Sequence, residues 1–225
     1  MNTIVKFAGA AFIGSMMLAA PANAALISVA GACGSLSGPT ELNGSFNCTR
    51  FDSTIGTLAS MTLTITGQIG GTITLSNGGG TAASFAGTTQ SQFYIGALPG
   101  FTLSSPLFTA SMGTGLQSIA GGASTVFGPL SGSANSGAMV NTTNFTGYQA
   151  PGGGVFGIGA QTLTGLLISG GGGQAGGSQS TTGVASATVS YLYDDGVVTT
   201  PEPASMALLG AGMLALGVAR RRRRS

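Results

Sequence analysis

The stretch MTLTIT, residues 61–66, decides the fold class, because apolar and hydroxyl side chains alternate through it without interruption. Successive side chains of a β-strand point to opposite faces of a sheet, so strict alternation is typical of a strand with one dry and one wet face. Gly67 interrupts the pattern, TITL at residues 72–75 resumes it, and NGGG at residues 77–80 ends it. We expect an antiparallel hairpin or meander here.

A second strand is predicted near the end of the domain, at VASATVSYLY, residues 184–193, where alternation places Val189, Tyr191 and Tyr193 on one face. Between the two, short apolar clusters are separated by Gly, Ser and Pro, and no helical periodicity is present. The clusters at 93–95, 126–127 and 162–168 are further candidate strands, and the glycine runs at 152–154 and 170–173 are candidate loops. The pattern predicts an all-β domain with an antiparallel β-sandwich or jelly-roll-like fold.

Charge is almost absent from this domain. Between residues 25 and 200 one basic residue, Arg50, stands against four acidic ones, giving a net charge of 1 − 4 = −3, and residues 53–193 carry no charge. The acidic residues are Glu41, Asp52, Asp194 and Asp195. Nucleic-acid affinity depends on clustered Lys and Arg, so nucleic acid is excluded as a partner. Recurrent Val, Ile, Leu and Phe favour a folded domain over a disordered one.

The N-terminus has the features of a secretory signal peptide, residues 1–24. A single positive charge, Lys6, precedes an apolar run at residues 7–20, and Ala22 and Ala24 form a small-x-small cleavage site. We predict cleavage after Ala24. The alternative, a retained membrane anchor, needs a longer apolar run.

Two cysteines, Cys33 and Cys48, follow the predicted cleavage site. An isolated pair in an oxidising exported compartment indicates a disulfide. A metal site is the alternative, but it needs more ligands than two thiols, and the sequence contains no histidine. We therefore expect a structural disulfide, no metal and no cofactor.

The C-terminal tail, residues 197–225, has three parts. Pro201, Glu202 and Pro203 come first, an apolar segment at residues 204–219 follows, and a basic cluster ends the tail. The cluster consists of Arg220, Arg221, Arg222, Arg223 and Arg224. The apolar segment predicts a single transmembrane helix, about 24 Å long against a hydrocarbon core of about 30 Å. Arginines directly after it act as a stop-transfer signal and stay in the cytoplasm, which leaves the β domain, residues 25–196, outside. The prolines predict an extended, accessible strip ahead of the helix.

The tail resembles the PEP-CTERM sorting signal of Gram-negative bacteria, with the tripeptide, the short apolar segment and the arginine run in the same order at the C-terminus. The resemblance implies an exported protein that an exosortase recognises and cleaves near the tripeptide. It further implies transient anchoring in the inner membrane and a host that makes extracellular polysaccharide.

The β domain resembles the choice-of-anchor E domain, a group of exported bacterial domains found with different C-terminal anchors. The resemblance rests on residues 50–58 (RFDSTIGTL), residues 61–66 and residues 189–193 (VSYLY), and it covers about residues 25–194. It implies an all-β extracellular module and brings no catalytic residues.

Candidate catalytic groups are few. A glycosidase would pair Asp52 with Asp194 or Asp195, since two carboxylates flank the scissile bond. However, Asp194 and Asp195 are followed by Gly196, a pattern typical of the end of a strand. A serine triad fails for lack of histidine. Four tyrosines are candidate platforms for sugar rings, although packing within the strands explains them better: Tyr94, Tyr148, Tyr191 and Tyr193.

The sequence therefore predicts an exported, non-catalytic protein of the cell surface or of an exopolysaccharide or biofilm matrix. A carbohydrate-binding module or adhesin that uses exposed aromatic side chains is the alternative, with extracellular polysaccharide as its partner. An enzyme is the least supported class.

Overall fold

The computed structural model describes residues 26–171, 174–197 and 202–222. It contains a β domain, Leu26–Val197, and a C-terminal helix that belongs to a separate unit. The predicted signal peptide with Ala22 and Ala24 lies outside the described residues, as do Pro201, Arg223 and Arg224.

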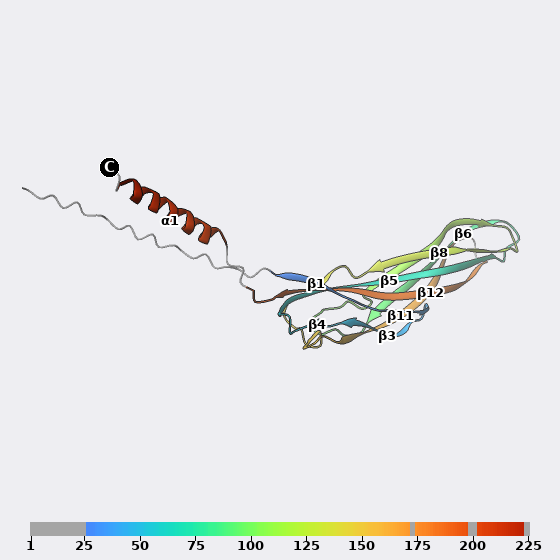
Figure 1. Cartoon of the computed structure of the whole chain (residues 1–225). Helices are drawn as coiled ribbons and strands as arrows, with labels where there is room; N and C mark the ends of the chain where they lie inside the picture. The colour runs from blue at the N-terminus through green and yellow to red at the C-terminus, as the bar shows by residue number, and fades with distance from the viewer. Residues whose placement is uncertain (1–25, 172–173, 198–201, 223–225) are drawn as a thin grey trace, which may run out of the picture. The chain divides into compact units, whose positions relative to one another are not determined.

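The β domain is built from strands that follow one another along the chain with no helix among its described residues (Figure 1). They are β1 (Ile27–Gly31), β2 (Ser35–Pro39), β3 (Asn43–Thr49), β4 (Phe51–Asp52), β5 (Thr57–Asn77), β6 (Ala83–Ile95), β7 (Phe108–Ile119), β8 (Ser124–Asn135), β9 (Met139–Asn141), β10 (Gln149–Ala150), β11 (Val155–Gly170) and β12 (Ala175–Asp194).

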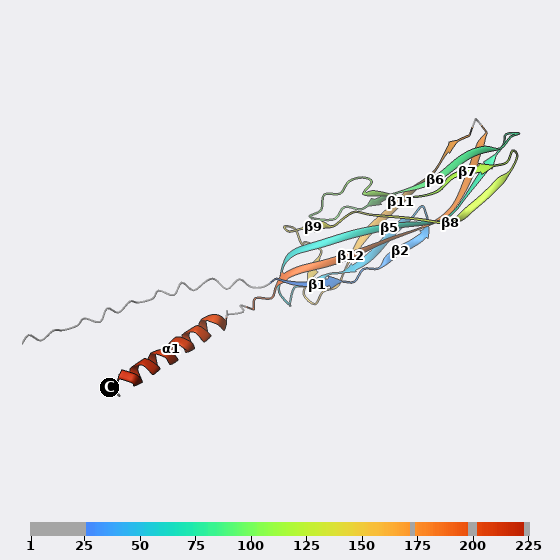
Figure 2. The same ribbon diagram turned by 90° about the horizontal axis from the view of Figure 1, so that it is seen from above.

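The strands form two antiparallel sheets. In the six-stranded sheet, β12 and β5 lie side by side, β1 and β2 follow the free side of β12, and β8 and β9 follow the free side of β5 (Figure 2). The four-stranded sheet has the order β3-β11-β6-β7, and a short parallel pair joins β10 to β4. The expected all-β antiparallel sandwich is confirmed, and each candidate strand of the sequence lies within one of these strands.

The predicted hairpin at residues 61–75 is wrong, because β5 runs as one strand of 21 residues through Gly67. An ideal Cβ at Gly67 would lie 2.5 Å from Cζ of Phe93 and 2.6 Å from Phe108. These two rings stack with centroids 5.0 Å apart. Glycine at this position makes room for the rings and does not mark a turn. The chain turns only after Asn77, whose side-chain amide donates to the carbonyl oxygens of Thr81 and Ile119.

Alternation along the strands fills the space between the sheets. Met61, Leu63 and Ile65 of β5 are fully buried, as the sequence predicts. Val189 and Tyr191 of β12 are buried in the same cluster. A second, smaller cluster contains Ile73, Leu75, Phe85 and Ile119. Burial of each such aliphatic or aromatic side chain contributes about 1.5–3 kcal/mol, so these positions supply most of the driving force for folding.

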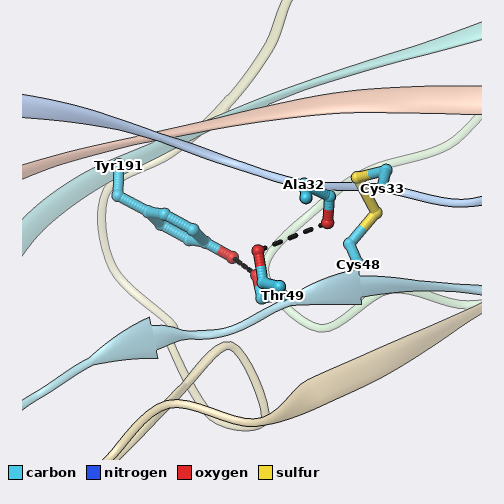
Figure 3. The surroundings of a disulfide bond; sticks show 5 residues. All are labelled: Ala32, Cys33, Cys48, Thr49 and Tyr191. Carbon is cyan, nitrogen blue, oxygen red and sulfur yellow. Dashed lines mark hydrogen bonds between the residues drawn. A yellow bond between two sulfur atoms is a disulfide. The ribbon is translucent and has the colours of Figure 1, made fainter.

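The two sheets are tied together where the chain passes from β1 to β2. The backbone N–H of Thr49 donates to the carbonyl of Ala32 at 2.8 Å, and Gly34 N donates to Asn47 O at 2.8 Å. Between these bonds, Cys33 and Cys48 form the expected disulfide, with Cα atoms 4.0 Å apart (Figure 3). The hydroxyl of Tyr191 reaches across from β12 and donates to Thr49 O at 2.6 Å. One edge of the sandwich is therefore joined by both covalent and hydrogen bonds.

The sheets also approach each other where β8 lies near β7. An ideal Cβ at Gly132 of β8 would collide with the carbonyl oxygen of Ser111 in β7. Only glycine allows two backbones to come this close.

The C-terminal helix α1 spans Glu202–Arg222, so helical structure begins two residues earlier than predicted. Pro203 is compatible with the first turn, where a missing N–H leaves no intrahelical bond unmade. The expected extended strip at the tripeptide is therefore wrong for Glu202 and Pro203. In the part of the chain that the structure describes, no helix is long and apolar enough to cross a membrane, which differs from the span predicted at residues 204–219.

Replacing both cysteines (Cys33→Ala with Cys48→Ala) is expected to lower the free energy of unfolding by about 3 kcal/mol, because the disulfide closes a loop of 15 residues in the unfolded chain. Urea denaturation of the wild type and the double variant, each with and without reductant, measures the difference. Reductant should affect only the wild type. Identical unfolding midpoints for oxidised wild type and double variant would contradict the role of this bond.

Candidate functional site

The carboxylate of Asp52 organises a turn. Its Oδ1 accepts hydrogen bonds from the backbone N–H of Thr54 at 2.9 Å, the Thr54 hydroxyl at 2.7 Å and the backbone N–H of Gly152 at 2.8 Å. The Thr54 hydroxyl and the two N–H groups hold the pKa of this carboxyl below its usual value. Asp52 thus links the end of β4 to the loop after β10 and keeps its charge in doing so.

Asp194 and Asp195 serve the turn that ends the β domain. Oδ1 of Asp194 accepts from Gly196 N at 2.8 Å, and Oδ1 of Asp195 accepts from Val197 N at 2.9 Å. The contacts of Asp194 and Asp195 are those expected of turn-forming carboxylates, as the sequence Asp194-Asp195-Gly196 predicts. Glu41, the remaining acidic residue of the domain, is exposed.

Two of the four candidate sugar-stacking tyrosines are inside the domain. Tyr148 and Tyr191 are each 2% exposed, so the packing role expected from the sequence is confirmed for both and the alternative of exposed sugar platforms is wrong for them. Tyr148 packs edge-on against Phe101 and Phe156, with centroids 5.9 and 5.0 Å away. Tyr193 is half-buried and lies 5.1 Å from the ring of Phe51. The alternation predicts that Tyr191 and Tyr193 share a face of β12, but it does not show that this face is the buried one.

The interior also contains polar atoms without partners. Among the described residues, Tyr148 Oη and Arg50 Nε are buried and accept or donate no hydrogen bond. Burial raises the pKa of Tyr148 to about 12. Burial also raises the pKa of Tyr191 above its ordinary value, with Tyr148 adding to the effect and Arg50 opposing it. Tyr191 differs from Tyr148 in having a partner, the carbonyl of Thr49.

Tyr94 has a different position, on the outer face of the four-stranded sheet. It is half-buried, and its hydroxyl donates to Oε1 of Gln92 at 2.6 Å. In the register of the sheet, Gln161 of β11 lies between Tyr94 of β6 and Asn43 of β3. The Gln161 side-chain amide donates to Oδ1 of Asn43 at 3.2 Å.

This outer face is hollowed in two places. One depression of about 470 Å³ is lined by Gln90, Gln92 and residues 163–167 of β11. The other, of about 350 Å³, is lined by Asn43, Gly44, Tyr94, Ile95, Gly96, Gly159, Ala160 and Gln161. Neither Gln90 nor Gln161 was singled out from the sequence. The signal that could have found them is the alternation GxGxQxLxGxL at residues 157–167, once that face is known to point outward.

In the tail, the described residues include Glu202 and Arg222 at the two ends of α1, and the last turn of the helix carries Arg220, Arg221 and Arg222. The order of acidic start, apolar middle and basic end is the order of the predicted sorting signal. Residues 199–224 match the PEP-CTERM protein-sorting motif. A PEP-CTERM motif implies an exported Gram-negative bacterial protein that is transiently anchored in the membrane and sorted by an exosortase.

No curated protein matches the chain. Solved structures of infectious bursal disease virus have a low similarity to this chain. The Gx strain structure is 11% identical with a TM-score of 0.21, and the match covers 76% of this chain and 36% of the viral chain. The Gt strain structure is 12% identical with a TM-score of 0.15, covering 86% and 50%. The chain thus spans between about a third and a half of those viral chains. Neither the sorting motif nor these viral structures show the resemblance to choice-of-anchor E domains.

The two buried tyrosines should respond oppositely to loss of the hydroxyl. Tyr148→Phe is expected to raise the free energy of unfolding by about 1 kcal/mol, because it removes a buried hydroxyl without a partner. Tyr191→Phe is expected to lower it by about 1 kcal/mol, because it breaks the bond to Thr49. Urea denaturation of both variants measures the two changes, and equal losses in both would refute the difference in hydrogen bonding.

Asp52→Asn should change the acid sensitivity of the domain. A carboxyl whose folded pKa lies below the unfolded value of 3.8 stabilises the fold above about pH 4 and loses that effect as pH falls through the folded value. The variant is therefore expected to melt below the wild type at pH 7, with the difference shrinking towards pH 2. Thermal melting from pH 2 to 7 tests this, with Glu41→Gln as the control for loss of one negative charge. A difference that is constant with pH would count against the Asp52 contacts.

Proposed function

We propose that this chain is an exported, non-catalytic protein of the cell surface or the exopolysaccharide and biofilm matrix. In this proposal a signal peptide, residues 1–24, is removed after Ala24. An exosortase then processes the tail near Pro201, Glu202 and Pro203. The observation that carries the proposal is the match of residues 199–224 to the PEP-CTERM sorting motif.

The β domain supports an extracellular role. The Cys33–Cys48 disulfide suits an oxidising exported compartment. The side chains that general acid–base catalysis would need are occupied in other ways: Asp52, Asp194 and Asp195 accept hydrogen bonds from turn backbones, and Tyr191 donates to a strand carbonyl. A surface with few charges favours association with neutral polymers over free solubility.

We also propose that the domain is an extracellular module of the choice-of-anchor E kind. The sequence blocks on which that resemblance rests converge at one end of the sandwich. Tyr193 pairs with Leu58 in the β12–β5 ladder. Phe51 contacts Tyr191 and Tyr193, with ring centroids 5.8 and 5.1 Å apart. This shared local core supports the proposal.

A carbohydrate-binding module or adhesin is the second candidate. Its support is the hollowed outer face of the four-stranded sheet, where Tyr94 lies among the amides of Gln92, Gln161 and Asn43. The buried Tyr148 and Tyr191 have no part in this candidate.

The sorting proposal is tested with Glu202→Ala. In cells that make the protein, the wild type is expected to lose its tail and leave the membrane fraction, whereas the variant keeps the tail and stays with the inner membrane. Cell fractionation and mass spectrometry of the C-terminal peptide measure both.

Glu41→Ala is the matched control, since it removes an exposed acidic residue of the β domain and leaves the tail unchanged. Normal processing and release of Glu202→Ala would overturn the assignment of the tripeptide as the recognition site.

A further inference from the structure

The outward side of β11 contains glycines that the fold itself does not require. Gly159 and Gly165 lie within the strand and are exposed, and neither has a positive φ angle. An ideal Cβ at either position would meet nothing within 4 Å. By contrast, Gly67 and Gly132 lie where a Cβ would strike a ring or a backbone oxygen.

Glycine inside a strand weakens it, because the unfolded chain loses more conformational freedom and no side chain packs on the neighbours. Such a glycine often marks a place where a ligand or another backbone comes close to the strand. Neither turn geometry nor internal packing requires glycine at positions 159 and 165. What Gly159 and Gly165 do provide is an open surface on this face of the strand.

These glycines lie in the floor of the two depressions described above. Gly165 lines the one with Gln90 and Gln92, and Gly159 lines the one with Tyr94 and Gln161. The depressions adjoin in the register of β6 and β11, because Leu163–Gln92 is the next pair after Gln161–Tyr94 on the outer face. We refer to the two adjoining depressions together as the trough. From Gln90 to Gly96 the trough covers six steps of a strand, or about 20 Å.

The chemistry of the trough is polar but uncharged. The amides of Gln90, Gln92 and Gln161 offer N–H donors and carbonyl acceptors beyond the bonds that Gln92 makes to Tyr94 and Gln161 makes to Asn43. This combination matches hydroxyl groups, which both donate and accept. Leu163 and Leu167 are 56% and 61% exposed at the same face, and with the ring of Tyr94 they offer apolar surface. No residue from 53 to 193 carries a charge that would attract an anionic or cationic ligand.

We propose that this trough, formed by the outer faces of β6 and β11 with Asn43 of β3, binds an extended segment of a neutral polysaccharide. The hydroxyls of the sugar bond to the amides, and the apolar faces of its rings lie against Leu163, Leu167 and Tyr94. The proposal rests on the exported location under Proposed function and specifies the ligand class of the second candidate there.

The test fills the floor of the trough and leaves the core untouched. Gly165→Val and Gly159→Val place a strand-favouring side chain in open space, so both variants should fold and resist urea at least as well as the wild type. Gly80→Val is the matched control, because its Cβ also meets nothing within 4 Å but lies in the loop after β5.

The protein isolated from the cells that produce it is run in native gels containing one of four polymers. These are dextran, hydroxyethyl cellulose, the neutral extracellular polysaccharide of the same cells, and alginate as an acidic counterpart. The wild type and Gly80→Val should be retarded by a neutral polymer, with the apparent Kd at least tenfold weaker for Gly165→Val and Gly159→Val. Alginate should not retard any of them.

Three results would overturn the proposal: no retardation by the neutral polymers, equal retardation of the wild type and the filled variants, or preference for alginate. A fourth contrary result would come from sedimentation of the same samples. If the wild type is a dimer that Gly165→Val loses, and no polymer binds, the face belongs to an interface with a second copy of the chain. Since the assay uses isolated protein, its failure is distinct from a failure of sorting, which the Glu202→Ala fractionation reports.

Discussion

The antiparallel pairing of β5 with β12 is the interaction on which the rest of the domain depends. The two strands remain paired from Ala175–Asn77 to Asp194–Thr57, with a single register shift near Tyr193. Each then offers its free side to other strands, β12 to β1 and β2, and β5 to β8 and β9. The inward side chains of this pair, among them Leu63, Ile65 and Val189, are the floor against which the four-stranded sheet packs. Without this pair neither sheet has a complete buried face.

Much of this pair was readable from the sequence, and the reason is physical. Met61, Leu63 and Ile65 alternate with threonine because one face of the sheet is buried and the other is not, and the same constraint marks Val189 and Tyr191. The continuity of β5 was not readable. Gly67 has the same sequence signature whether it ends a strand or makes room for Phe93 and Phe108, and only the facing sheet distinguishes the two.

The candidate sites divide in the same way. The sorting tail was predicted from a local pattern, and the match at residues 199–224 confirms it. The tyrosines could not be sorted by local sequence, because exposure depends on which face of each strand meets the other sheet. Tyr148 and Tyr94 both stand near glycine in polar surroundings, yet one is buried against Phe156 and the other borders the trough. The trough could not be predicted from the sequence, because glycines within a strand have the same sequence pattern as a loop.

The means by which the two sheets are held together has a consequence for the medium in which the protein works. Apolar packing, the Cys33–Cys48 bond and the backbone hydrogen bonds beside it join them, and no side chain from 53 to 193 is charged. Dissolved ions weaken attraction between exposed charges and have little effect on buried apolar contacts. The stability of the domain therefore depends little on the screening of charges by salt in the medium outside the cell.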